Sequence, residues 1–195
     1  MINKIILASK SGVRKKILNQ NGINCEVIPS NVDEEEIKIS LQKENASPQM
    51  ISKNLAELKA NKISVKKPNE LVLGADSVID LDNELISKPK DREEALNILK
   101  KLNGKKHKLI SSVCISKNGS MIWNFTKASS LTMKNLNLEE LKSYLDRIKD
   151  KDLFAYGVYQ IEADGRLLFS KIEGDENTIM GLPVKEINEY LKNFK

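Results

Sequence analysis

Asp76 is the residue of this sequence best suited to acid–base or metal chemistry, because it is a single carboxylate directly after an apolar run. The run covers residues 71–75, and Lys88 follows beside Pro89. In open α/β sheets, ligands bind at the carboxyl ends of strands, so we expect a buried strand to end at Asp76. Paired with an ordered lysine, such a carboxylate can bind a metal or deprotonate water. The alternative is a purely structural acid in an Asx-turn.

A candidate phosphate-binding turn precedes the first expected helix. Ser9 and Ser11 stand just before this helix, and its first turn contains Arg14, Lys15 and Lys16. Backbone N–H groups at a helix start attract anions, and hydroxyls with a guanidinium complete a phosphate cradle. A serine N-cap followed by surface lysines explains the same residues equally well, so both interpretations stay open.

Two further charged features also have a structural and a functional interpretation. Lys59 follows Leu55 by four residues and Leu58 by one, so we expect it near the apolar face of a helix. Its ammonium group either reaches solvent along that face or points into a cleft. Residues 33–36 form an acidic run, which is either the solvated start of a helix or a source of ligands for Mg²⁺ or Mn²⁺.

Composition indicates a folded α/β chain with an excess of lysine. The 195 residues are 40% hydrophobic and 30% charged, enough to bury a core in one large or two small domains. The net charge is +5, and without an arginine cluster or aromatic platform it favours anionic small substrates over a nucleic-acid partner. No apolar run approaches the roughly 20 residues of a membrane span, so we expect no membrane association and a cytoplasmic protein.

The few histidines and cysteines exclude several kinds of site. His107 is the only histidine, so it has no second imidazole with which to share a metal, and no nucleophile-elbow glycine pattern accompanies it. Cys25 and Cys114 lack metal or redox spacing, and we expect buried free thiols. If the protein is an enzyme, carboxylates, lysines and a hard metal must carry its chemistry.

The elements that must position these groups alternate between strands and helices. In the first half we expect strands at 4–8, 24–29, 71–75 and 83–87, and helices at 14–21, 48–63 and 91–102. In the second half, Asn118-Gly119 and Asp164-Gly165 predict two hairpins, followed respectively by a helix at 138–147 and a last helix near Pro183. We interpret the chain as one α/β unit with mixed strands and two lobes separated by a cleft.

Several of these segments, in this order, resemble the Maf family of nucleoside triphosphate pyrophosphatases. The resemblance runs essentially from end to end of the chain. The matching stretches are Ser9 to Arg14, Asp33-Glu34, Lys59 within LAELKA, Ala75-Asp76-Ser77, Lys88-Pro89, GVYQIEA at 157–163 and the closing IEGDENTIMGLPV.

The resemblance implies a fold and a reaction. It implies an elongated mixed β-sheet flanked by helices, similar to the inosine triphosphatases, with residues 1–195 forming a single domain of two lobes around a cleft. The implied reaction converts a nucleoside triphosphate and water to the monophosphate and diphosphate with Mg²⁺ or Mn²⁺. A homodimer, a role in cleansing the nucleotide pool and a link to inhibition of septum formation also follow from the resemblance alone.

The resemblance also implies roles for individual residues. Asp76 would accept the proton of the attacking water and lie beside the metal, and Glu34 would help to hold that metal. The groups that would bind the triphosphate are Ser9, Arg14, Lys59 and Lys88.

Some positions depart from the family pattern. Gly12-Val13 replaces Pro-Arg, which removes one cation and makes the turn more flexible. Ser77 and Glu162 stand at positions linked to base choice, and Ala163 replaces a glycine. Trp123 and the LTM segment favour the branch near the 7-methyl-GTP-type enzymes, but the choice between methylated purines and pyrimidines stays open. A catalytically weakened nucleotide-binding regulator is the alternative function.

Overall fold

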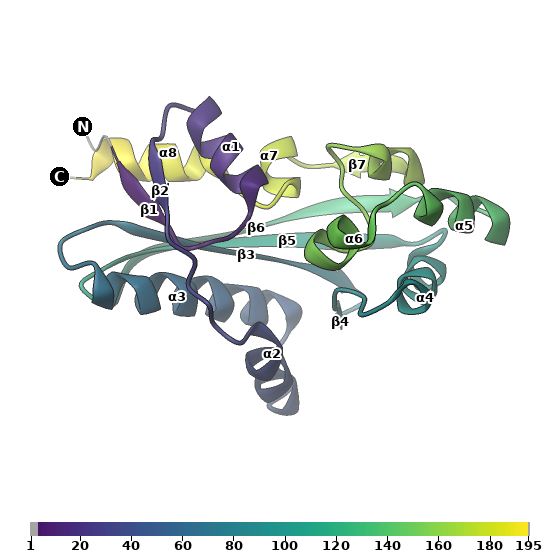
Figure 1. Ribbon diagram of the computed structural model, residues 1–195, viewed down its shortest axis with the longest axis horizontal. Coiled ribbons are helices and arrows are strands. Elements are labelled where there is room, and N and C mark those ends of the chain that lie inside the picture. Colours follow the sequence, from purple (N-terminus) through teal and green to yellow (C-terminus); the bar gives the residue numbers. More distant parts are fainter. Residues whose placement is uncertain (1–3, 195) are drawn as a thin grey trace.

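The structure, a computed structural model, describes residues 4–194. A seven-stranded mixed sheet runs through the molecule in the order β2-β1-β3-β5-β6-β7, with β4 paired to β3 (Figure 1). The strands are β1 Ile5–Leu7, β2 Cys25–Val27, β3 Val72–Leu81, β4 Glu84–Ile86, β5 Lys106–Lys117, β6 Ser120–Met133 and β7 Phe169–Glu173. The expected mixed α/β fold is therefore confirmed.

Three long antiparallel strands, β3, β5 and β6, form the centre of the sheet. The predicted hairpin between β5 and β6 is present, and both Asn118 and Gly119 have positive φ, at 52° and 81°. Such a turn matches the right-handed twist of the flanking strands. The parallel strands β1 and β2 extend the sheet on the other side of β3.

The helices pack around this sheet. They are α1 Gly12–Gln20, α2 Glu34–Lys43, α3 Pro48–Lys66, α4 Arg92–Leu102, α5 Leu138–Asp146, α6 Asp150–Tyr156, α7 Glu176–Ile179 and α8 Val184–Asn193. The long helix α3 lies on one face of the central strands, and α1 and α8 lie on the other (Figure 1). None of the helices in residues 4–194 is long and apolar enough to cross a lipid bilayer.

The polar residues that precede the helices explain where several of them begin. Six helices have an N-cap side chain that accepts a hydrogen bond from the backbone three residues later, namely Ser11, Asp33, Ser47, Asp91, Asn137 and Asp175. These caps satisfy N–H groups that have no partner within the helix. They place α1 and α2, which carry predicted site residues, at defined positions.

Two large apolar clusters lie toward opposite ends of the long strands. One packs α1 and α8 against β1, β3 and β5, and includes Leu7, Leu73 and Ile187. The other packs α4 and α5 against β6 and β7, and includes Leu99 and Leu131. The side chains of β3 alternate between the two faces, so Leu73 and Ala75 face α1 and α8 whereas residues 76 and 78 face α3.

Several sequence predictions were wrong in detail. β3 does not end at Asp76 but continues to Leu81, because the apolar residues after it pair with β4 and β5. Asp164-Gly165 is not a hairpin turn but begins a 3₁₀ helix, Asp164–Leu168, and only the segment after it is a strand. The helix α6 was not predicted. Cys114 is buried as expected and Cys25 is only half-buried, both as free thiols.

Candidate active site

The candidate site is at a gap in the pairing of β3. On one edge, β1 pairs with Val72 and Leu73 and β4 pairs with Ile79 to Leu81. Within residues 4–194, no strand pairs with the stretch 74–78 on that edge. Asp76 and Ser77 lie in this gap, and both line a cavity although they are in mid-strand.

Asp76 forms a buried ion pair with Lys59 of α3. The Lys59 ammonium donates to Asp76 Oδ1 at 2.8 Å and forms an ion pair with Glu34 Oε1 at 2.9 Å, and thus links two carboxylates. Asp76 and Lys59 are both 5% exposed, whereas the Glu34 side chain is 38% exposed. Among the described residues, the second oxygen of Asp76, Oδ2, is buried without a hydrogen-bond partner. A buried acceptor of this kind is costly unless a ligand satisfies it.

A close approach of α3 to β3 brings Lys59 to Asp76. Gly74 faces α3, and a Cβ atom built on it would lie 2.1 Å from the carbonyl oxygen of Ala56 and 2.7 Å from the nitrogen of Ala60. Only glycine fits at this contact. Lys59 is on the buried face of α3 with Leu55, as predicted, but Leu58 is on the exposed face.

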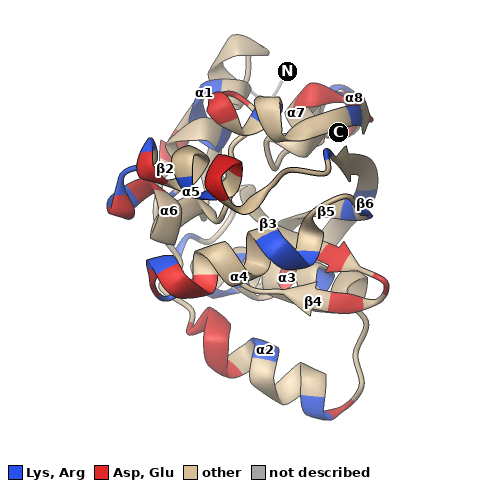
Figure 2. Ribbon diagram, turned by 90° about the vertical axis from the view of Figure 1, so that its right-hand side faces the viewer, with Lys and Arg blue, Asp and Glu red and all other residues tan. Residues whose placement is uncertain are grey.

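Glu34 reaches the site from the first turn of α2. The N-cap residue of α2, Asp33, accepts a hydrogen bond from the Glu36 N–H, which explains why the acidic run begins a helix. Figure 2 shows this acidic turn at the end of α2 nearest the rest of the molecule. Partial burial raises the pKa of Glu34, but Lys59, Lys88 and Lys38 lower it more, and the net pKa is below its ordinary value.

Arg14 is held by the protein through most of its donors. Nε donates to Gly181 O (2.9 Å), Nη1 to Ser9 Oγ (3.1 Å) and Ala75 O (3.0 Å), and Nη2 to Ser77 Oγ (3.1 Å). Burial lowers the pKa of Arg14, against the opposing effect of Asp76 and Glu34. These bonds use four of its five N–H groups, so one has no partner within residues 4–194. Its predicted contact with a triphosphate stays a prediction.

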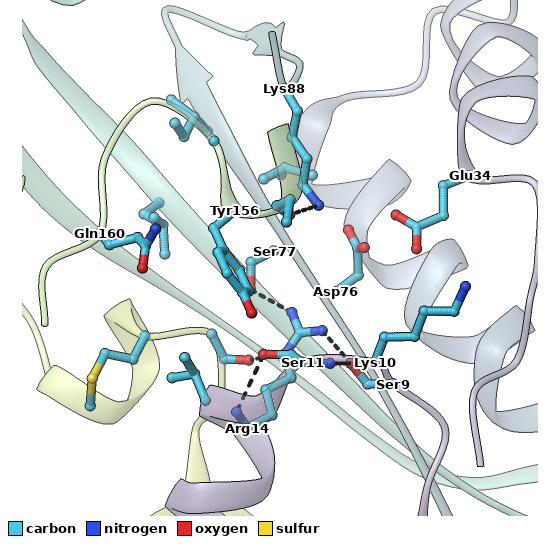
Figure 3. Close-up of a pocket in the computed structure, with 18 of the residues that line it drawn as sticks. Ser9, Lys10, Ser11, Arg14, Glu34, Asp76, Ser77, Lys88, Tyr156 and Gln160 are labelled. Atoms are coloured by element: carbon cyan, nitrogen blue, oxygen red, sulfur yellow. Dashed lines mark hydrogen bonds between the residues drawn. The ribbon is translucent and has the colours of Figure 1, made fainter. Parts of the chain in front are cut away.

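Ser9 and Lys88 are also directed to this region (Figure 3). Ser9 Oγ accepts from the Ser11 N–H and from Arg14, so its own hydrogen is free to be donated to a ligand. Lys88 comes from the loop after β4, and its ammonium donates to the Ala155 carbonyl of α6 at 2.6 Å. Burial lowers the pKa of Lys88. We expect a ligand to compete with Ala155 for this ammonium group.

A cavity of about 460 Å³ joins these groups. All the predicted site residues line it: Ser9, Arg14, Glu34, Lys59, Asp76 and Lys88. Lys38 and Tyr156, which lie outside the matching stretches, and Lys10 and Gln160, which lie within them but were given no role, also line it. Lys15 and Lys16, which follow Arg14 after the candidate phosphate-binding turn, are exposed and outside the cavity.

The carboxylates fit a divalent metal shared with a phosphate substrate. In the described part of the chain, no three His, Cys, Asp or Glu residues are grouped as a complete metal site. Mg²⁺ needs no such group, because it commonly binds one or two carboxylates together with water and substrate phosphates. Asp76 Oδ2 has no partner among these residues, and Glu34 is partly exposed, so both are suitable ligands.

Comparison with solved structures first defines the class of fold. The structure of a HAM1 protein from Coxiella burnetii superposes with a TM-score of 0.55 at 13% identity, over 98% of this chain and 99% of that chain. The sequence then defines the family. The chain belongs to the Maf-like protein family, whose family model matches residues 4–194. The resemblance read from the motifs is thereby confirmed.

Two relatives show how similar family members are described. A nucleoside triphosphate pyrophosphatase of Pelagibacter ubique (strain HTCC1062) is 69% identical over 195 residues, which is 100% of each chain. A 7-methyl-GTP pyrophosphatase of Brucella abortus biovar 1 (strain 9-941) is 35% identical over 195 residues, covering 100% of this chain and 98% of the relative.

Proposed function

We propose that this protein hydrolyses a nucleoside triphosphate to the monophosphate and diphosphate. The observation that carries the proposal is the buried carboxylate of Asp76, whose Oδ2 has no hydrogen-bond partner among residues 4–194 and which lines a cavity with lysines and an arginine. The full-length similarity to relatives named as pyrophosphatases supports the same reaction. Cationic groups favour a triphosphate because they stabilise the charge that grows on the leaving diphosphate.

Asp76 acts as the general base in this proposal. Lys59 donates to Oδ1 and fixes the carboxylate, so Oδ2 is the atom that accepts a proton from the attacking water. Ser9, Arg14, Lys59 and Lys88 bind and orient the triphosphate. Glu34, with Asp76 beside it, would hold Mg²⁺ or Mn²⁺, and the bound ion would neutralise phosphate charge and polarise the phosphoryl group.

The favoured substrates are modified nucleotides, with 7-methyl-GTP the first to test. The name of the Brucella relative supports this choice, as does the family branch indicated by Trp123. Ser77 and Glu162 line the cavity, and Ser77 Oγ is bound by Arg14 and lies 2.9 Å from Ser111 Oγ. We propose that the protein is cytoplasmic and forms a homodimer, each chain being one domain of two lobes. We propose no nucleic-acid partner, and its role would be to cleanse the nucleotide pool.

The test is a panel of standard, methylated and modified nucleoside triphosphates with Mg²⁺ or Mn²⁺. Diphosphate and monophosphate are measured separately. We expect both products in equal amounts, a loss of at least about a hundredfold in Asp76→Asn, and no activity in EDTA. Asp80→Asn is the matched control, since Asp80 is also buried in β3 but lies outside the cavity.

Other outcomes of the panel point to other functions. Release of orthophosphate instead of diphosphate contradicts the proposed reaction. Nucleotide binding without turnover of any substrate favours the alternative, a nucleotide-binding regulator of septum formation whose altered Gly12-Val13 turn no longer supports catalysis.

A further inference from the structure

Lys38 is a buried cation in the cavity that no motif identified. It lies on α2 four residues after Glu34, so the two side chains share one face of the helix. Lys38 is 7% exposed and lines the cavity. The flanking residues Ile37 and Leu41 pack against an apolar cluster with Leu55, which holds α2 in this orientation.

The partner of Lys38 distinguishes it from the other lysines of the cavity. Lys59 is bound by two carboxylates and Lys88 by a carbonyl. Lys38 donates to Glu35 Oε1 at 2.9 Å, and the Glu35 side chain is 62% exposed. An ion pair with an exposed glutamate one turn away is weak, because water competes for the carboxylate. A ligand can therefore replace Glu35 at little cost.

The charges around the cavity also indicate that an anionic ligand can bind Lys38. Its lining contains the cations Lys10, Arg14, Lys38, Lys59 and Lys88 and the anions Glu34, Asp76 and Glu162. Burying an ammonium group beside other cations is unfavourable unless an anion joins them.

We propose that Lys38 is an additional phosphate-binding residue, which leaves Glu35 and contacts the phosphate chain of the substrate. This inference rests on the proposed function, and it concerns the same cavity. Because α2 carries both Glu34 and Lys38, one helix presents a metal ligand and a phosphate ligand side by side. The two groups together suit a phosphate chain that carries a divalent cation.

Two variants separate this role from a purely structural ion pair. Lys38→Met and Glu35→Gln both break the pair, so a structural role predicts equal effects. A phosphate-binding role predicts a KM about tenfold higher for Lys38→Met, with kcat changed less, and a KM no higher than wild type for Glu35→Gln.

Two further variants test the charge and its position. Lys38→Arg should recover most of the loss in KM that Lys38→Met shows. Lys43→Met, an exposed lysine of the same helix, should behave as wild type. Equal KM values for Lys38→Met and Lys43→Met would overturn the inference.

Binding of inorganic tripolyphosphate, measured by calorimetry, tests the same contact without turnover. We expect about tenfold weaker binding to Lys38→Met than to wild type or Lys43→Met. Unchanged tripolyphosphate affinity overturns the phosphate assignment, even if KM for a nucleotide rises. If no nucleotide is hydrolysed by the wild type but Lys38→Met alone loses tripolyphosphate, the proposed function fails and the anion contact stands.

Discussion

The guanidinium of Arg14 donates a hydrogen bond of 3.0 Å to the carbonyl oxygen of Ala75, the residue before Asp76. This carbonyl lies in the stretch of β3 between β1 and β4, which no strand within residues 4–194 pairs on that edge of β3, so an arginine side chain supplies the donor that a strand would otherwise provide. The same guanidinium binds the carbonyl of Gly181. Arg14 thus connects α1, β3 and the turn before α8.

Replacement of Arg14 by lysine should therefore lower stability as well as any phosphate affinity. Lysine cannot span the two carbonyls and two hydroxyls that the planar guanidinium reaches, so we expect a loss of about 2 kcal/mol in the free energy of unfolding. Urea denaturation measures it. Arg147→Lys is the control, since Arg147 is half exposed and 3.7 Å from Asp164, and its effect should stay within about 0.5 kcal/mol. Equal losses in the two variants would contradict the structural role of Arg14.

Loss of Lys59 should destabilise the fold through the carboxylate it leaves behind. In Lys59→Met, Asp76 stays buried without its ion-pair partner, and we expect about 3 kcal/mol of destabilisation near neutral pH. Glu34 is partly exposed and can turn to water. The double variant Lys59→Met/Asp76→Asn should regain much of that loss, because the uncompensated charge is gone. If the double variant is less stable than Lys59→Met, the cost has another origin.

Proline at position 12 should stabilise the protein. Gly12 is the first residue of α1, where proline is favoured, and a Cβ built on it meets nothing within 4 Å. Ser11 before it is extended, with φ −68° and ψ 113°, as a residue preceding proline requires. We expect Gly12→Pro to add about 0.5–1 kcal/mol in denaturation experiments. Gly22→Pro, at a glycine with φ of 75°, should instead destabilise. A lower stability of Gly12→Pro would show that the turn needs the freedom of glycine.

His107 should make stability depend on mildly acidic pH. It is 2% exposed, its Nε2 lies 2.8 Å from the Tyr159 hydroxyl, and burial lowers its pKa from 6.5 to about 4. Because the unfolded chain binds this proton below pH 6.5 and the folded chain only below about 4, the free energy of unfolding falls as pH is lowered through this window.

The size of this effect follows from the two pKa values. We expect a loss of about 2 kcal/mol from pH 7 to pH 5 that is absent in His107→Gln. Urea denaturation of both proteins at the two pH values isolates it. Parallel pH dependence in the two proteins would mean that His107 does not titrate on unfolding.

The sequence predictions were correct where a structural feature depends only on residues adjacent in the sequence. The turn at Asn118-Gly119 and the start of a helix at Pro48 depend on a few adjacent residues, and both were predicted correctly. Asp76 was predicted at a strand end because the neighbours of β3 were unknown. Its location in a gap between β1 and β4 is a property of the whole sheet.

The failed hairpin at Asp164-Gly165 has a tertiary cause. A Cβ built on Gly165 would lie 2.5 Å from the carbonyl oxygen of Gln160, so the chain folds back on itself before it can form a strand. Val158, Tyr159 and Ile161 are all buried, without the alternation of a paired strand. Lys38 was missed for a different reason. Its spacing of four from Glu34 was visible, but only the packing of α2 shows that this face lines the cavity.

The distance between α3 and β3 at Gly74 has a consequence for any change to this site. Lys59 can approach Asp76 because Gly74 has no Cβ atom. Even one methyl group on residue 74 would push α3 away from β3. Asp76, the proposed general base, and Lys59, the cation that binds it, belong to a strand and a helix, and the close contact at Gly74 sets the distance between these two backbones. Position 74 thus limits how this scaffold can be redesigned, although Gly74 does not line the cavity.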